Sequence, residues 1–427
     1  MIRIILLLIF ATKLMSKDIQ EFALSIIAHP PLISLKQALN EAKKQNYDLQ
    51  KEYKQLQIAS SARDKSFAPL IPRLDFFLAK EAKLFQNNEN DNDKAVFKLE
   101  TKLFDMKSLF AVKSSSDELR AAKYNYEQAS NKIFFEVANA YSETLIAQSL
   151  AVLAQEELEQ YQKQLEVYQK KLQAGLARPL DISRGEYLFN KSKTNLILKK
   201  RDFERKRAQL GALISRKELF QVEDFLLESP YFDESLEILQ SLAQNTAESN
   251  SLKLKYSAQN YSILSEGFNY FPILKTTIEG GLHTPPHDNS SPSHEAFSKI
   301  MFTIELPIFN QGLPHAELKK KIAQRDLIEL SQRELQLTKH LGINGVLEQI
   351  QASQVALTSA DLALKAAKKA KKSAERLYKA QEATALELVE ANVNFSSAQS
   401  LFLNAQLHLK QSKLQLLYLI GKMSEIE

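Results

Sequence analysis

Apolar and polar residues alternate along four stretches of the chain, which form two pairs. The apolar positions of the first pair are Leu74, Phe76, Leu78, Phe97, Leu99 and Leu103. The apolar positions of the second pair are Leu274, Ile278, Leu282, Ile300, Phe302 and Ile304. Because successive side chains of a strand point to opposite faces, this alternation predicts two β-hairpins, over residues 73–104 and 272–308, each apolar on one face.

Elsewhere the apolar residues recur at helical spacing. Steps of three and four residues, the pattern of a heptad seam, separate Leu158, Tyr161, Leu165, Tyr168 and Leu172. Neither Gly nor Pro occurs between Arg73 and Ala174, or from Val346 to Ile420. The sequence therefore predicts two helical hairpins, each made of a long helix, a tight turn and a return helix, over residues 105–215 and 310–421. Shorter helices are predicted ahead of the β-hairpins, over residues 33–67 and 233–269.

The two halves of the chain repeat this order of elements. Phe104 and Phe309 each end an alternating stretch just before a long helical segment, and they lie 205 positions apart. Self-similarity at a fixed offset predicts a duplicated unit of helix, β-hairpin and long helical hairpin. The first copy is expected in residues 17–216, and a linker with the second copy in residues 217–427. The predicted fold class is mainly α with a β-barrel part.

The N-terminus has the layout of a secretory signal. Arg3 precedes an uninterrupted apolar stretch that ends near Ala11, and polar residues follow. This pattern predicts a signal peptide over residues 1–16, although an N-terminal core strand would show the same apolar run. The stretch is too short to span a bilayer as a helix, and no later segment is a better candidate. If the chain sits in a membrane, it must do so as a β-barrel.

Composition excludes several classes of function. The 56 lysines and arginines barely exceed the 51 acidic residues, so charge indicates no nucleic-acid partner. Cysteine is absent, which excludes a thiolate metal site and a lipid anchor on an N-terminal cysteine. No Gly-rich phosphate loop, metal-ligand spacing or nucleophile motif is present, so we expect neither an enzyme nor a bound cofactor.

The predicted strands require more than one copy of the chain. Four strands are too few to close a barrel, and an open sheet edge in lipid leaves backbone groups unpaired. Several copies must therefore combine if the hairpins lie in a membrane. The alternative from the same pattern is a structural coiled-coil scaffold whose strands form a small soluble sheet, because such a sheet alternates in the same way.

Four segments together resemble the TolC family of bacterial outer-membrane efflux proteins, and the resemblance covers nearly the whole chain. The most specific is the strand–helix junction Leu306-Pro307-Ile308-Phe309-Asn310-Gln311-Gly312. The others are Leu35-x-x-Ala38-Leu39-x-x-Ala42, the turn at residues 175–181 and the segment at residues 378–391. The resemblance implies a homotrimer with a twelve-stranded barrel in outer-membrane lipid and an α-helical barrel through the periplasm. It also implies two partners, a periplasmic adaptor (membrane fusion) protein and an inner-membrane pump.

The function implied by this resemblance is that of the outer-membrane channel of a tripartite efflux system. Such a channel would export small molecules or metal cations from the periplasm or the pump to the outside. An exit duct for type I protein secretion is an alternative within the same family. The sequence of the channel does not distinguish drugs, metal cations and proteins as cargo, because a channel of this kind has little selectivity of its own.

The resemblance also assigns roles to individual residues. Those expected at the periplasmic aperture are Glu387 and Glu390, as acidic rings, and Tyr378 and Asp181, as tethers between helices. Those expected at the tips that contact the adaptor are Gly175, Leu176, Ala177, Gln381, Glu382 and Ala383. Those expected at the strand–helix junctions are Phe104, Asp105, Pro307, Phe309 and Asn310, where Asp105 and Asn310 can also cap the helices that follow.

Two positions depart from the family pattern, and one cluster suggests a metal. Gln381 stands where the family usually has Gly, and Ala383 stands where some members have an Arg that closes the aperture. These departures predict a latch that is weaker or differently paired. A histidine cluster in the loop of the second hairpin offers possible metal ligands, although ordinary loop histidines are the simpler interpretation. Its members are His283, His287 and His294.

Overall fold

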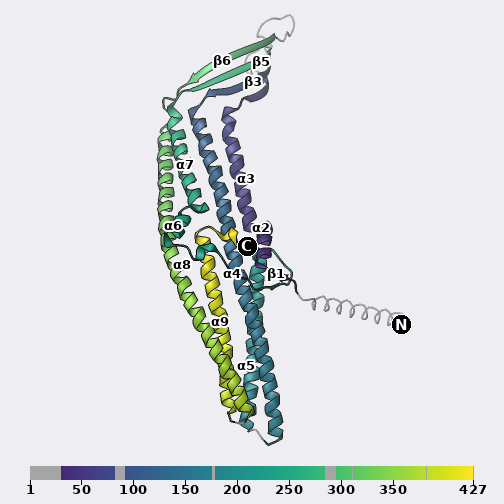
Figure 1. Cartoon of the computed structure of the whole chain (residues 1–427). Helices are drawn as coiled ribbons and strands as arrows, with labels where there is room; N and C mark the ends of the chain where they lie inside the picture. Colours follow the sequence, from purple (N-terminus) through teal and green to yellow (C-terminus); the bar gives the residue numbers. More distant parts are fainter. Residues whose placement is uncertain are drawn as a thin grey trace, which may run out of the picture.

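The computed structural model describes residues 30–81, 92–175, 178–283, 295–309, 311–380 and 382–426. The molecule is elongated, with a small sheet at one end and the turns of two long helical hairpins at the other (Figure 1). The predicted signal peptide lies outside the described residues. Among the helices that the structure describes, none combines the length and the apolar character needed to cross a bilayer.

The two halves contain the same series of elements, as the duplication predicted. The first half consists of α2 (Leu35–Gln45), α3 (Tyr47–Phe67), β2 (Arg73–Glu81), β3 (Asn92–Phe104), α4 (Met106–Gln173) and α5 (Pro179–Leu213). The second half consists of α6 (Leu236–Gln244), α7 (Ala247–Gly267), β5 (Ile273–His283), β6 (Glu295–Glu305), α8 (Leu313–Lys379) and α9 (Ala385–Leu419). The strands lie within the two predicted hairpin ranges, and each long helix is followed by a return helix.

The shorter helices differ from their prediction, because each is divided in two. Asn46 interrupts the helical stretch after α2, where its side-chain oxygen accepts the backbone N–H groups of Asp48 and Leu49 at 2.9 and 3.1 Å. In the second half the division falls at Thr246, whose backbone is extended. The buried Lys339 of α8 bonds the Thr246 hydroxyl there. At Asn46 the side chain that caps α3 competes with continuation of α2, and apolar periodicity does not reveal such a cap.

One antiparallel four-stranded sheet joins the two hairpins, in the order β2-β3-β5-β6. Its register places Phe76 opposite Phe97, and places Ile278 between Leu99 and Ile300. The paired apolar positions therefore share one face, as the alternation predicted. Leu103 is an exception, because the register shifts between Lys102 and Phe104 and Phe104 lies opposite Leu274. The opposite face is mainly polar and includes Arg73, Asp75, Lys98, Glu100, Lys275, Glu279, Lys299 and Thr303.

The main apolar core lies halfway along the molecule, where α2, α4 and α9 meet the short paired strands β1 (Leu32–Ile33) and β4 (Gln221–Val222). Tyr141 of α4 is fully buried there, and its hydroxyl lies 2.7 Å from the Ile33 carbonyl oxygen. Gln148 of α4 bonds both the N–H and the C=O of Val222. These contacts hold the middle of α4 in the core. The sheet lies at one end of the molecule and the hairpin turns lie at the other (Figure 1).

Candidate functional site

The turns of both helical hairpins lie at the end of the molecule remote from the sheet (Figure 1). Gly175 adopts φ +73°, a left-handed conformation that ends α4 and turns the chain toward α5. In the second hairpin, the N–H groups of Glu382 and Ala383 both bond the Leu377 carbonyl, at 2.9 and 3.3 Å. Of the residues expected to contact an adaptor, Leu176, Ala177 and Gln381 lie outside the described residues.

Asp181 is buried near the start of α5, with 9% of its surface exposed. Its Oδ2 accepts the backbone N–H of Arg178 at 3.2 Å and lies 3.6 Å from the Arg178 guanidinium Nε. The second oxygen, Oδ1, is buried and has no hydrogen-bond partner among the described residues. Asp181 is thus held within its own hairpin, by a basic side chain of the same turn.

Tyr378, near the end of α8, is brought to α4 of the first hairpin. Its ring meets that of Tyr168 edge-on, with the centroids 6.5 Å apart. The Lys171 ammonium lies 4.5 Å from the Tyr378 ring centroid and 3.5 Å from its hydroxyl. Burial raises the pKa of Tyr168 to about 12, and burial also raises the pKa of Tyr378. Both phenols are therefore neutral hydrogen-bonding groups at physiological pH.

Glu387 and Glu390 are both exposed on α9, and their local roles differ. Glu387 caps its own helix, because its Oε2 accepts the Thr384 N–H at 2.7 Å while the Thr384 hydroxyl accepts the Glu387 N–H. The backbone and side-chain hydrogen bonds from Thr384 lower the pKa of Glu387. Glu390 has no hydrogen-bond or ion-pair partner among the described residues. Glu390 is thus the more available of the two for an external cation.

Sequence reasoning placed Tyr168 only in the heptad seam of α4 and gave Lys171 no role. In the structure these two residues form the contact between the hairpins at Tyr378. The signal in the sequence was small. The Tyr168 hydroxyl accepts the Gln164 amide N–H of its own helix at 2.6 Å, so its contact with Tyr378 is between the rings. The sequence does not say which distant helix supplies the facing ring.

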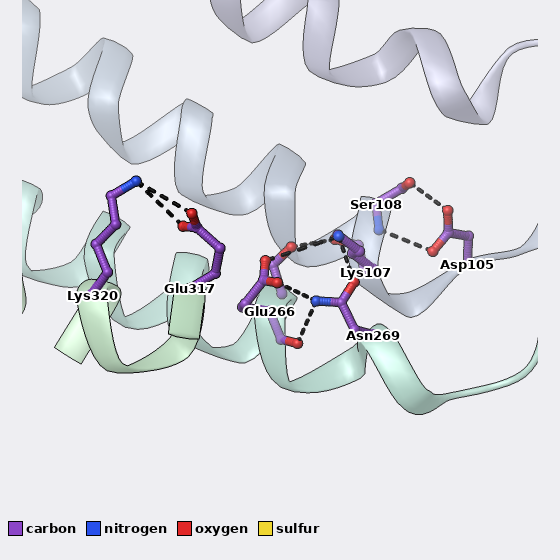
Figure 2. A network of polar contacts seen from close by, with 8 residues as sticks. Asp105, Lys107, Ser108, Glu266, Asn269, Glu317 and Lys320 are labelled. Atoms are coloured by element: carbon purple, nitrogen blue, oxygen red, sulfur yellow. Dashed lines mark hydrogen bonds and ion pairs between the residues drawn. The ribbon is translucent and has the colours of Figure 1, made fainter. Parts of the chain in front are cut away.

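The first strand–helix junction is organised by Asp105, which caps α4 as predicted. Its carboxylate accepts the backbone N–H of Ser108 at 3.2 Å, the Ser108 hydroxyl at 2.6 Å and the Lys102 ammonium at 2.7 Å. Burial opposes ionisation of Asp105, but these hydrogen bonds prevail and its pKa is lowered. Figure 2 shows the cap beside a second network, in which Lys107 of α4 bonds Asn269 and approaches Glu266 at 3.9 Å.

The second junction differs from its prediction. The helix α8 begins at Leu313, and the residue that precedes it is Gly312 with φ +73°, so Asn310 is not the N-cap. Asn310 itself lies outside the described residues. Pro314 occupies the first turn of the helix. Phe309 is 81% exposed, so its ring has no apolar cover within a single chain.

Most of the histidines considered as metal ligands lie outside the described residues. His287 and His294 lie outside the described residues, and His283 is placed only as the last residue of β5. Among the residues that the structure does describe, no group of three or more His, Asp or Glu side chains is arranged to hold a metal ion.

A family model described as outer membrane efflux protein matches residues 38–216 and 238–422. These two segments include most of the chain and correspond to its two halves. The chain belongs to the outer membrane efflux protein family. No curated protein matches it in sequence.

Several solved structures share the fold of this efflux protein. CmeC, the outer membrane channel of Campylobacter jejuni, matches with a TM-score of 0.78 and 18% identity, over 91% of this chain and 85% of its own. VceC of Vibrio cholerae matches with a TM-score of 0.77 and 18% identity, over 91% and 96%. CusC matches with a TM-score of 0.78 and 16% identity, over 91% and 92%. Identities this low establish the common fold alone.

Proposed function

We propose that three copies of this chain form an outer-membrane channel that exports small molecules or metal cations. In this proposal the channel works together with a periplasmic adaptor and an inner-membrane pump. The observation that carries it is the apolar face of the four-stranded sheet. Its large side chains are exposed in a single chain, at 76% for Leu78, 69% for Phe302 and 74% for Ile304. An apolar surface of this extent needs a cover, and lipid is the cover that suits an alternating sheet.

The edges of the sheet support assembly. Among the described strands, β2 and β6 each have one neighbouring strand, so they form the two edges of the sheet. Unpaired backbone groups are not tolerated in lipid, at a cost of several kcal/mol each. Pairing β6 of one copy with β2 of the next removes both edges. Closure of three copies into a twelve-stranded barrel is the arrangement that the family resemblance supplies.

The helices support the same assembly. Leu327, Leu330, Leu337 and Leu341 of α8 are each about 60% exposed, at 66%, 63%, 61% and 59%. Their spacing of three, four and seven residues is that of a coiled-coil seam, which a helix of a second copy would cover. Joined in this way, the long helices would enclose a passage continuous with the barrel.

Near the turns, this chain has a groove that is suitable for binding the adaptor. A groove of about 880 Å³ lies between α5 and α9, with Leu198, Val393 and Leu401 among its apolar lining residues. Amphipathic helices dock in grooves of this kind through residues spaced by three and four positions. We assign the groove and the adjoining turns, including Gly175, Glu382 and Ala383, to the adaptor.

A pair of neighbouring residues on β6 tests the membrane assignment. Phe302 lies on the apolar face and Thr303 on the polar face, and both are exposed. A lysine in place of a lipid-facing residue costs about 2–4 kcal/mol at the bilayer midplane. We expect Phe302→Lys to reduce the amount of SDS-resistant trimer in outer-membrane fractions severalfold, and Thr303→Lys to leave it unchanged.

The matched control separates lipid burial from a general effect of added charge, because both variants gain one lysine on the same strand. The proposal is wrong if the wild-type chain purifies as a monomer that stays in solution without detergent. That result would favour the scaffold alternative.

A further inference from the structure

A small cavity lies between the tips of the two helical hairpins. It has a volume of about 180 Å³. Leu188 of α5 contributes an apolar wall from the first hairpin, and Leu386 and Val389 of α9 contribute apolar walls from the second. Tyr168 of α4 and Tyr187 of α5 also line the space. The cavity thus resembles the interior of a ligand site, mostly apolar and bounded by two aromatic rings.

Asp181 and Arg184 are the charged residues in this lining, and only Asp181 is buried. Asp181 lines the cavity, and more than nine-tenths of its surface is buried. The contacts from Arg178 go to Oδ2, while Oδ1 is buried and accepts no hydrogen bond from any described residue. A buried carboxylate oxygen without a donor is costly, so a ligand that brings an N–H group to it gains a charge-assisted hydrogen bond.

We propose that this cavity binds a small organic cation that has an aromatic body and an ammonium or guanidinium group with N–H donors. Cavities of about 150 Å³ lined by apolar side chains hold benzene, so this one has room for a single ring with a short charged tail. The ring packs between Tyr168, Tyr187 and the aliphatic wall. The charged group donates to Oδ1 of Asp181, and the ring of Tyr168 favours a cation over an anion. The Tyr187 ring already has the Lys191 ammonium 5.9 Å from its centroid, so it contributes apolar contact.

Two arginines near the cavity must be considered in deciding whether the ligand is a cation or an anion. Arg178 contacts only the oxygen that the ligand does not use. Arg184 lines the cavity as well, but it is exposed, and solvent screens its charge. The buried acceptor is therefore the group that a ligand must satisfy. An anion would place like charges together at the one carboxylate in the lining.

The ligand would contact both hairpins, because Asp181 and Tyr187 belong to the first and Val389 to the second. Its binding would stabilise the arrangement of the tips seen here. The binding measurement itself does not depend on the proposed channel function. A chain that failed to form a trimer would still bind or fail to bind the cation.

The experiment uses the full chain in detergent micelles and 4-fluorobenzylammonium as the probe, followed by ligand-observed fluorine NMR. The uncharged 4-fluorobenzyl alcohol and the anionic 4-fluorobenzoate serve as ligand controls. We expect the ammonium to bind at least ten-fold more tightly than either control. We expect Asp181→Asn to weaken its binding about ten-fold, which is the loss of one charge-assisted hydrogen bond.

Two further variants guard against misfolding, since Asp181 also supports the start of α5. Ala385→Leu fills the cavity from α9 without touching the carboxylate and should abolish binding of the probe. Asp361→Asn removes a partly exposed carboxylate on α8 that pairs with Lys365, and should leave binding unchanged. Equal affinity for the alcohol and the ammonium, or unchanged affinity in both Asp181→Asn and Ala385→Leu, would overturn the proposal.

Discussion

Of two adjacent glycines of β5, only Gly281 should be sensitive to substitution by alanine. Gly281 pairs with Val96 of β3, the strand that joins the first half of the sheet to the second. A Cβ atom at Gly281 would lie 2.0 Å from the Ala95 carbonyl oxygen and 2.9 Å from Cα of Val96. A Cβ atom at Gly280 would lie 3.6 Å from its nearest neighbour, the Phe297 carbonyl oxygen, which is an ordinary contact.

The size of the effect follows from this geometry. To restore a separation of 3.0 Å, the backbone of β3 must move away from β5 by about 1.0 Å, the difference between 3.0 and 2.0 Å. A shift of about 1 Å takes the neighbouring ladder hydrogen bonds beyond their normal length. The loss of two hydrogen bonds costs about 0.5–1.5 kcal/mol each, and overpacking adds about 1–3 kcal/mol. The substitution should therefore destabilise the strand pairing by about 2–6 kcal/mol.

We expect Gly281→Ala to abolish or strongly reduce the heat-modifiable, SDS-resistant trimer in outer-membrane fractions, and Gly280→Ala to assemble like the wild type. Gel mobility with and without boiling measures the trimer, and immunoblotting of whole cells measures total chain. Equal amounts of trimer from the two variants would refute the reasoning, because the strand pairing would then tolerate a Cβ at either position.

Two further predictions concern the ends of helices. Replacing Asp105 by Ala removes the N-cap and three hydrogen bonds to a carboxylate that is 3% exposed, and should destabilise the chain by about 2–4 kcal/mol in thermal unfolding followed by circular dichroism. Asp105→Asn keeps an acceptor and should lose clearly less, so equal losses would contradict the assignment. The double substitution Glu387→Gln and Glu390→Gln should reduce the cation selectivity measured in single-channel recordings. Unchanged selectivity would exclude these two residues from the aperture. Because hydrogen bonds from Thr384 lower the pKa of Glu387, its share of the selectivity should persist as the pH falls through the ordinary glutamate range and disappear only below it.

The differences between prediction and structure share a cause. Asn46 and Thr246 divide helices that apolar periodicity predicted as continuous. The Asn46 side chain caps α3, whereas Thr246 has an extended backbone and its hydroxyl bonds Lys339. Gly312 precedes α8 in place of the expected Asn310, because a left-handed glycine sets the start of the helix. Each case involves a polar or backbone feature of a single residue, which a pattern averaged over many positions does not resolve.

The sequence by itself determined the elements and their duplication. Strand alternation, the heptad seam of α4 and the cap at Asp105 depend on residues close together in the chain, so their physical causes are local. The tertiary structure alone decided the pairing of β3 with β5, the contact of Lys171 with Tyr378, and the burial of Asp181 beside α9. Those contacts join segments that are far apart in the chain, by 207 residues for Lys171 and Tyr378. Many partners would satisfy the same side chains until packing selects one.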